Sequence, residues 1–397
     1  MGGHIAVAGG SIGGLFAALA LVEAGWRVTV FEKVSRALSG RGAGIVTHEP
    51  LLKALGSVGV VFQDIGVEVC YRRVFDKSGK IVSELEFPQL VTSWDMIYSL
   101  LHERLPHELY FTDKSVVDWE DLAGKVSVHL SDGSVRHFDA LIGADGYRSS
   151  VRSKFVERPA PEYSGYVVWR AVVEEALVEP SLRDAIFDDF SFFLPNNGQV
   201  IGYPIPGANN DMRKGQRRYN IVWYKPTSDD ELVDLLTDEN GKVHDISIPP
   251  PLVRRGVVDC ALRAAEDDLP WMFSEVFKCA ASPFLAPIYD YVSPRFCCGK
   301  VSLLGDAAAL IRPHVGMGVT KAAEDALCLS SCLQTNRTID EAFEAYDSKR
   351  RPIALMINTR SQRLGSFVQS EDPKGNLGGA SHPFEDEIVR LTATADF

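Results

Sequence analysis

The 397-residue sequence predicts an α/β fold in which a first domain is interrupted by a second, mainly β domain. A strand, a glycine turn, a helix and a strand follow one another within the first 31 residues, and a similar pattern of strand, turn and helix is found again after residue 299. The stretch 163–284 instead contains long aromatic strands. We therefore expect the first domain to comprise 1–70, 98–165 and 285–367, the second 71–97 and 166–284, and a tail to follow over 368–397.

Composition and charge exclude several classes of function. Apolar residues make up 46% and charged residues 24%, as in ordinary globular proteins, and the net charge of -12 would repel nucleic acid or an anionic membrane. The apolar stretch 5–31 contains a glycine cluster and lacks a basic leader, so we expect neither a signal peptide nor a membrane helix. Seven cysteines without metal-ligand spacing predict reduced thiols, a cytoplasmic location and no metal site.

The first elements form a βαβ unit, with strands at 5–8 and 27–31 and a helix at 15–24 that ends at Gly25. Between strand and helix lies a degenerate dinucleotide fingerprint, in which Gly9 and Gly14 fill the first and third glycine positions and Ser11 fills the second. Glu32 ends the second strand, where a carboxylate accepts ribose hydroxyls and disfavours a 2′-phosphate. These features predict a Rossmann-like nucleotide site whose contacts are Gly9, Ser11, Ile12, Gly13, Gly14, Glu32 and Lys33.

The next elements lead to a second motif. We expect a helix at 50–60, a β-hairpin over 69–87, a helix at 93–105 and a β-meander over 115–138. A strand at 139–143 then returns to the first sheet and ends in Asp145-Gly146. The serine pair that follows is placed to cap a short helix.

A third motif follows the aromatic strands, which we place at 191–194, 200–204 and 219–224. A strand delivers Asp306 to a sheet edge, Pro313 stiffens the next loop, and Gly316 and Gly318 let backbone approach a flat or anionic ligand. A helix begins near 318, and another is expected over 339–367. A helix N-terminus at this place would stabilise negative charge on a reduced flavin.

Together these stretches resemble the single-component FAD-dependent aromatic hydroxylases, the p-hydroxybenzoate hydroxylase family, over the chain to about residue 367. The residues that match the family's second and third motifs are Asp145, Gly146, Ser149, Arg152, Gly305, Asp306, Pro313, Gly316, Gly318, Glu324, Asp325 and Ala326. Departures from the common pattern are Ser11, Trp94, Ala309, Met317 and Thr320. Ser11 and the segments 94–98 and 203–206 are most similar to the 2,6-dihydroxypyridine 3-monooxygenase branch.

The resemblance implies a Rossmann-like FAD-binding domain with an inserted mixed β-sheet substrate domain. It implies hydroxylation of a small aromatic or N-heteroaromatic ring through a C4a-hydroperoxyflavin, with FAD as cofactor and dioxygen and NADH or NADPH as co-substrates. Asp306 would bind the ribityl chain, and Asp145 would serve both FAD and the nicotinamide. The remaining residues implied to contact the cofactor are Arg41, Gly42, Gly146, Pro313, Gly316, Met317, Gly318 and Val319.

The chemistry also requires a group that assists deprotonation of the ring hydroxyl, and His48, Tyr203 and His314 are the candidates. Each has a structural alternative: His48 as a helix-start residue, Tyr203 as core packing, and His314 as a ligand of loop backbone. Arg41 is equally compatible with a solvated loop. An FAD-dependent epoxidase, a nicotinamide dehydrogenase and a non-catalytic flavin-binding protein remain as alternatives. The sequence does not identify the substrate. It does not determine the oligomeric state either, and it is compatible with a homodimer.

Overall fold

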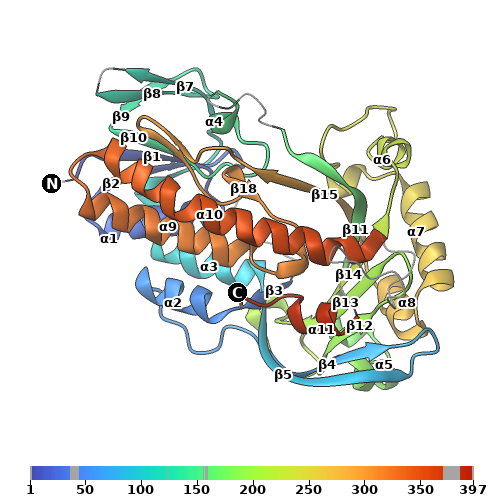
Figure 1. Cartoon of the computed structure of the whole chain (residues 1–397). Coiled ribbons are helices and arrows are strands. Elements are labelled where there is room, and N and C mark those ends of the chain that lie inside the picture. Colours follow the sequence, from blue (N-terminus) through green and yellow to red (C-terminus); the bar gives the residue numbers. More distant parts are fainter. Residues whose placement is uncertain are drawn as a thin grey trace.

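The structure is a computed structural model, and it describes residues 2–35, 44–122, 124–154, 156, 160–369 and 385–395. Its architecture is α/β with two large sheets, and the prediction of a Rossmann-like unit combined with a mixed sheet is confirmed (Figure 1). No helix in these ranges is long and apolar enough to cross a membrane.

The six-stranded sheet is mainly parallel and carries the Rossmann-like unit. Its strand order is β16 (Cys297–Cys298), β17 (Val301–Leu303), β10 (Ala140–Gly143), β1 (His4–Ala8), β2 (Arg27–Phe31) and β6 (Tyr110–Phe111). The central strands are apolar along their whole length because helices cover the sheet, and Ile5, Ala6 and Val7 are fully buried. The helix α1 (Ile12–Glu23) follows β1 directly, and Gly25 ends it at a φ of 82°.

The nine-stranded sheet is mostly antiparallel, with one parallel pair between β12 and β4. Its order is β18 (Ala309–Leu310), β15 (Phe284–Val292), β11 (Glu162–Glu174), β14 (Arg218–Pro226), β13 (Gln199–Ile205), β12 (Phe190–Phe193), β4 (Val67–Phe75), β5 (Ile81–Ser93) and β3 (Gly44–Thr47). A separate three-stranded meander comprises β7 (Val116–Leu122), β8 (Lys125–Leu130) and β9 (Val135–Phe138).

The two faces of the large sheet have different partners, because its strands alternate between two cores. One core lies against the helices at the outer side of the molecule, which are α5 (Pro180–Ile186), α6 (Asp229–Leu235), α7 (Arg255–Asp268) and α8 (Trp271–Lys278) (Figure 1). The other core contains Val315 and Met317, which belong to the third motif, and Ile388 and Val389 near the C-terminus. This inward face is therefore the side of the large sheet that meets the predicted site.

The remaining helices connect the two sheets. The helices α3 (Trp94–Arg104) and α9 (Gly318–Thr335) pack on α1, α2 (Glu49–Ser57) packs on α9, and the short α4 (Ser150–Ser153) lies beside the meander. The long helix α10 (Ile339–Ser366) packs on α9 and β15 and runs from one sheet toward the other (Figure 1). Thr338 and Glu341 form a capping box at its start. Beyond 367, the described part of the predicted tail contains the packed helix α11 (Glu385–Leu391).

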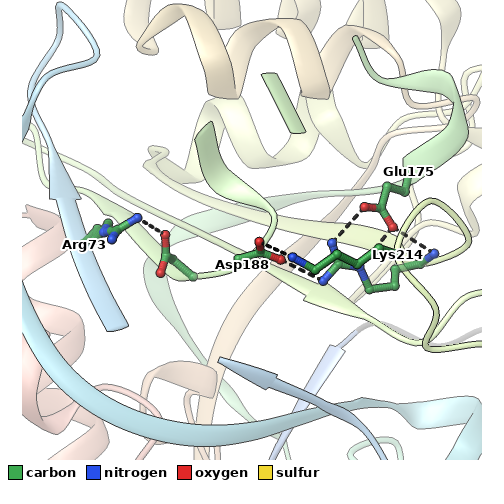
Figure 2. A network of polar contacts seen from close by, with 6 residues as sticks. Arg73, Glu175, Asp188 and Lys214 are labelled. Atoms are coloured by element: carbon green, nitrogen blue, oxygen red, sulfur yellow. Dashed lines mark hydrogen bonds and ion pairs between the residues drawn. The ribbon is translucent and has the colours of Figure 1, made fainter. Parts of the chain in front are cut away.

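An ion-pair network joins four strands of the large sheet at one end (Figure 2). Arg73 on β4 pairs with Asp189 just before β12. Arg217, just before β14, lies 2.8 Å from Glu175 and 3.1 Å from Asp188, and both Arg217 and Glu175 are buried. Since a buried charge left without its partner is costly, this network helps to fix the strand order.

Candidate active site

A cleft of about 820 Å³ opens at the carboxyl ends of the parallel strands. In open α/β sheets this edge is where nucleotide ligands bind. The predicted residues that line the cleft are Gly9, Ser11, Ile12, Gly13, Glu32, Lys33, Asp145, Gly146, Asp306, Gly318 and Val319. The three motifs therefore meet in one place. A larger hollow of about 1010 Å³, between the β4–β5 hairpin and α11, contains none of the predicted site residues.

The glycine turn requires glycine where backbone meets backbone. Gly9 has a φ of 97°, and a Cβ on it would lie 2.4 Å from the carbonyl oxygen of Ala144. A Cβ on Gly14 would lie 1.9 Å from the carbonyl oxygen of Gly9, so the third glycine lets helix α1 approach the turn. Ser11 occupies the N-cap of α1 without a side-chain capping bond, which leaves its hydroxyl available at the cleft. The N-terminus of α1 is thus open to phosphate.

Glu32 is held in place by the glycine turn that it faces. Its two carboxylate oxygens accept hydrogen bonds from the backbone N–H of Gly10 at 2.8 Å and of Val34 at 3.0 Å. A carboxylate has about four acceptor sites, so two remain for ribose hydroxyls. The Tyr110 hydroxyl donates to the Gly10 carbonyl at 2.9 Å and supports the same turn from β6.

Asp145 lies at the end of β10 with one oxygen engaged and one free. Its Oδ2 accepts from the Ser150 hydroxyl at 3.1 Å and from the Val151 N–H at 3.2 Å. Its Oδ1 is buried, and among the described residues no donor reaches it. Because a buried carboxylate oxygen without a donor is costly, this atom indicates a ligand hydroxyl or amide at the cleft. The predicted cap is present, since Ser149 accepts from the Arg152 N–H at 2.9 Å.

Arg152 connects the second motif to the third. Its side chain is buried, donates to the Ala307 carbonyl at 2.9 Å and lies 4.4 Å from the ring centre of Tyr291. Asp306 is adjacent and projects into the cleft, where its surface remains accessible. Desolvation by the surrounding protein raises the pKa of Asp306, and the negative charge of Asp325 raises it further. The positive charges of Lys321 and Arg152 act in the opposite direction.

The turn that carries Asp306 rests on a buried network in α9 and α10. Asp325 accepts from Lys321 Nζ at 2.8 Å and from Arg350 Nε at 2.7 Å, and it also accepts from the Gly305 N–H at 3.3 Å. Lys321 donates in turn to the Gly305 carbonyl at 3.0 Å. The Glu-Asp-Ala part of the third motif therefore acts beneath the cleft, where it fixes the turn.

The loop between Pro313 and Gly318 is shaped by its glycine and by His314. Gly316 adopts a left-handed conformation with a φ of 65°. His314 is buried, and its Nε2 lies 2.9 Å from the Tyr166 hydroxyl and its Nδ1 3.0 Å from Gln199 Oε1. Burial and the charge of Arg312 lower the pKa of His314 to about 3. His314 is therefore neutral near pH 7 and joins the loop to the large sheet.

His48, the N-cap residue of α2 directly after β3, and Tyr203 on β13 lie near this loop. His48 Nδ1 lies 3.0 Å from Thr320 Oγ1, and its Nε2 lies 3.3 Å from the Ala393 carbonyl oxygen. Tyr203 is buried and stacks on Phe190 with ring centres 4.8 Å apart. Burial raises the pKa of Tyr203 to about 12.

Arg41 and Gly42 lie outside the described residues. Pro313, Gly316 and Met317 shape the loop without lining the cleft, and Gly14 supports the turn beneath it. Sequence reasoning assigned no role to Tyr147 and Arg148, which line the cleft and contact Ser247. Their position directly after Asp145-Gly146 was the available signal.

The fold and the cleft define a protein that binds a dinucleotide cofactor, and comparisons with known proteins specify it further. The FAD binding domain-like family matches residues 163–290. The chain is 33% identical over 373 residues to 2,6-dihydroxypyridine 3-monooxygenase of Paenarthrobacter nicotinovorans, covering 92% of this chain and 91% of that protein. The solved structure of 2,6-dihydroxypyridine-3-hydroxylase from Arthrobacter nicotinovorans matches with a TM-score of 0.89 at 30% identity over 97% of each chain.

A more distant structure shares the fold and carries the cofactor. Klebsiella pneumoniae HpxO, solved with FAD and uric acid, matches with a TM-score of 0.74 at 21% identity, over 98% of this chain and 91% of that one. The chain described here belongs to the family of FAD-dependent aromatic hydroxylases, and it is a flavoprotein monooxygenase with FAD as its cofactor. The cleft fits FAD, because the turn at Gly9, the acceptor Glu32 and the free oxygen of Asp145 suit a dinucleotide.

Proposed function

We propose that this chain hydroxylates a small hydroxylated N-heteroaromatic ring of the 2,6-dihydroxypyridine type, with dioxygen and NADH or NADPH as co-substrates. The observation that carries the proposal is the similarity to 2,6-dihydroxypyridine 3-monooxygenase, which extends over 92% of this chain and so includes the large sheet. When bound, FAD would supply the redox chemistry, namely hydride acceptance from the nicotinamide and the activation of dioxygen.

The chain's own residues bind the cofactor and hold the ring. Glu32, Asp145 and Asp306 line the cleft as acceptors for cofactor hydroxyls and amides. The apolar residues Val315 and Met317 are buried between the loop and the large sheet, where they exclude water from the reacting ring.

Tyr203 is the best placed of the three catalytic candidates. Among the described residues no group is bonded to its hydroxyl, and with a pKa of about 12 that hydroxyl carries its proton at neutral pH. It can therefore donate a hydrogen bond to a ring oxygen and stabilise the oxyanion that makes the ring nucleophilic. His48 and His314 have both ring nitrogens engaged by protein groups, so we assign them the role of positioning the loop.

We also propose a discontinuous cofactor domain interrupted by a substrate domain, as expected from the sequence, and a cytoplasmic location. Strands of the six-stranded sheet come from residues 4–31, 110–143 and 297–303, in line with a discontinuous cofactor domain. All seven cysteines lie among the described residues and each is a free thiol, as is usual in reducing compartments.

The experiment is a screen of hydroxypyridines, hydroxybenzoates and non-aromatic alkenes for compounds that stimulate NADH or NADPH oxidation, followed by product analysis under ¹⁸O₂. We expect 2,6-dihydroxypyridine or a near analogue to gain one labelled oxygen. Labelled epoxide formed from an alkene, with no labelled ring product, would replace the proposal by an epoxidase. Oxidation of the nicotinamide with all of the label recovered in hydrogen peroxide or water, and none in an organic product, would contradict it.

A further inference from the structure

The inward face of the large sheet carries polar side chains whose free atoms are hydrogen-bond donors. In the β13–β14 pairing, Gln199 lies opposite Tyr224 and Tyr203 lies opposite Asn220. Gln199 and Asn220 are both fully buried. Residues of this face pack in one core with the loop residues Val315 and Met317.

The free atom of Gln199 is its amide nitrogen, because the neighbouring hydrogen bonds fix its orientation. Arg312 can only donate, and it contacts the Tyr166 hydroxyl at 3.3 Å, so the Tyr166 proton points to His314 Nε2. His314 then carries its proton on Nδ1 and donates to Gln199 Oε1. Gln199 Nε2 remains buried, and among the described residues it has no partner.

Asn220 is oriented in the same way from the other end of the face. Its Oδ1 accepts from the backbone N–H of Gly44 at 3.3 Å. Its Nδ2 is therefore the free atom, and it is buried without a partner in the described part of the chain. Gly44 also lies against the ring of Tyr203, since a Cβ there would be 2.3 Å from Cε2. The free amide thus lies next to the proposed catalytic hydroxyl.

Arg170 supplies a third donor together with a positive charge. It lies on β11 opposite Val222 of β14, in the row between Gln199 and Asn220. Its Nε is buried without an acceptor, and no carboxylate within the described ranges forms an ion pair with it. Its charge acts to lower the pKa values of Tyr203 and Tyr224, so its side chain is directed to the same face as these rings.

These free groups share one chemical property. Amide NH₂ groups and a guanidinium N–H donate hydrogen bonds and accept none. Buried donors without acceptors cost stability, which a ligand that supplies acceptors would recover. Tyr203 pairs with Asn220 across the strands, and Gln199 lies four residues before Tyr203 on β13. At about 3.3 Å per residue, the backbone positions of Gln199 and Asn220 are therefore roughly 13 Å apart along the strand direction. Because both side chains extend from the sheet, a single ring with an oxygen at each end is of the size that could meet them.

We propose that Gln199, Asn220 and Arg170 recognise the substrate, and that they select an anionic ring with acceptor oxygens at two separate positions. Arg170 compensates the negative charge, and the two amides each bind one ring oxygen. This inference rests on the proposed function, which it deepens by assigning the residues that determine specificity. Rings without oxygen substituents, and rings with a single one, are then poor ligands.

The test measures ligand binding rather than turnover. The oxidised holoenzyme is titrated with 2,6-dihydroxypyridine in the absence of nicotinamide, and the flavin absorbance change gives the Kd. We expect Arg170→Gln to raise the Kd by about tenfold or more, and Arg170→Lys to raise it less because the charge remains. Asn220→Asp and Gln199→Glu keep the side-chain shape and replace the free donor by an acceptor, so each should also raise the Kd by about tenfold or more.

A second probe separates recognition from general damage. With 2-hydroxypyridine, which carries one oxygen, we expect weaker binding to the wild type, and we expect only one of the two amide substitutions to weaken it further. Asn196→Asp is the matched control, since it makes the same change of side chain on an exposed turn and should leave the Kd within about twofold. The FAD content of each variant reports whether the fold is retained.

Three outcomes distinguish this inference from the proposed function. If the Arg170, Asn220 and Gln199 variants all bind 2,6-dihydroxypyridine within twofold of the wild type, the inference is wrong. It is also wrong if no anionic ring perturbs the flavin spectrum while a neutral ring supports hydroxylation, a result that leaves the hydroxylase itself intact. If the donor variants lose binding as expected but no ring is hydroxylated, the binding site stands and the proposed function fails.

Discussion

The backbone N–H of Ala393 donates a hydrogen bond to the carbonyl oxygen of His314 at 2.8 Å. The carbonyl oxygen of Ala393 in turn accepts from His48 Nε2 at 3.3 Å, which leaves His48 Nδ1 to accept from the Thr320 hydroxyl at 3.0 Å. The segment near the C-terminus therefore bonds to the loop between Pro313 and Gly318 and to His48 beside it. Ile388 of helix α11 is buried in the core that contains the loop residues Val315 and Met317, so this segment packs against the loop and stabilises its position.

The first prediction concerns this support. Ile388→Ala should lower the free energy of unfolding by about 2–5 kcal/mol, because it removes a fully buried side chain. It should also increase the fraction of NAD(P)H oxidised without ring hydroxylation, because the loop between Pro313 and Gly318 loses a packing contact that holds it in place. Ile81→Ala is the matched control at a side chain that is 41% exposed, and it should change stability by less than about 0.5 kcal/mol. Urea unfolding and product-to-nicotinamide ratios measure the two effects, and equal behaviour of the variants would contradict the role of the segment.

A second prediction concerns the buried ion pairs beneath Asp306. Burial alone raises the pKa of Asp325, but the charges of Lys321 and Arg350 outweigh it and hold that pKa below its ordinary value. Arg350→Met should cost about 3–5 kcal/mol of unfolding free energy near neutral pH, because it leaves a buried carboxylate with one partner fewer. The neighbouring Arg351→Met, whose side chain is more exposed, should have little effect.

The pH dependence of this difference has a definite sign. A carboxyl whose pKa is lower in the folded state contributes stability above its unfolded pKa, and the contribution is lost as the pH falls toward the folded value. The difference in unfolding free energy between the wild type and Arg350→Met should therefore become smaller below about pH 4. A gap that stays constant from pH 7 to pH 3 would show that Asp325 does not carry the effect.

His314 gives a third prediction, which concerns a buried base instead of a buried carboxyl. With a folded pKa of about 3, His314 stays neutral while the unfolded chain takes up a proton below about pH 6.5. Wild-type stability should thus fall as the pH decreases from 6.5, by up to about 1.4 kcal/mol per pH unit from this residue. His314→Gln should reduce that slope, whereas His107→Gln, at an exposed position, should not. Denaturant titrations at pH 7.5 and 5 decide between these outcomes, and an unchanged slope in His314→Gln counts against the buried neutral ring.

Asp306 gives the fourth prediction. Asp306→Ala removes the acceptor that projects into the cleft from the third motif, so the purified variant should contain much less FAD than the wild type. Asp184→Ala removes an exposed carboxylate from α5 and should retain full flavin. The flavin absorbance at a matched protein concentration gives the occupancy. Full occupancy in Asp306→Ala would mean that Asp306 does not hold the cofactor.

The parts of the fold that local sequence determines were predictable. The βαβ unit, the cap at Ser149 and the hairpin of β4 and β5 follow from apolar periodicity, glycine turns and capping residues, which act over a few positions. Most predicted cofactor contacts meet in one cleft for the same reason, because parallel strands bring their carboxyl ends to a common edge.

Contacts between distant segments were not predictable in this way. No periodicity indicates that Ala393 bonds to His314, or that Asn220 and Tyr203 lie opposite each other on neighbouring strands. A role for Arg170 was likewise not predictable, because its lack of an ion pair is visible only when its surroundings are known. Thr320 is a departure from the family pattern whose partner, His48, likewise became apparent only in the fold.

The central claim is that three segments distant in sequence form one cradle for FAD, and the flavin content of the purified protein tests it most directly. We predict a yellow protein with a flavin absorbance spectrum that releases close to one equivalent of FAD per chain on denaturation. A folded protein that is colourless as isolated, and that takes up no FAD when the cofactor is added, would contradict the account.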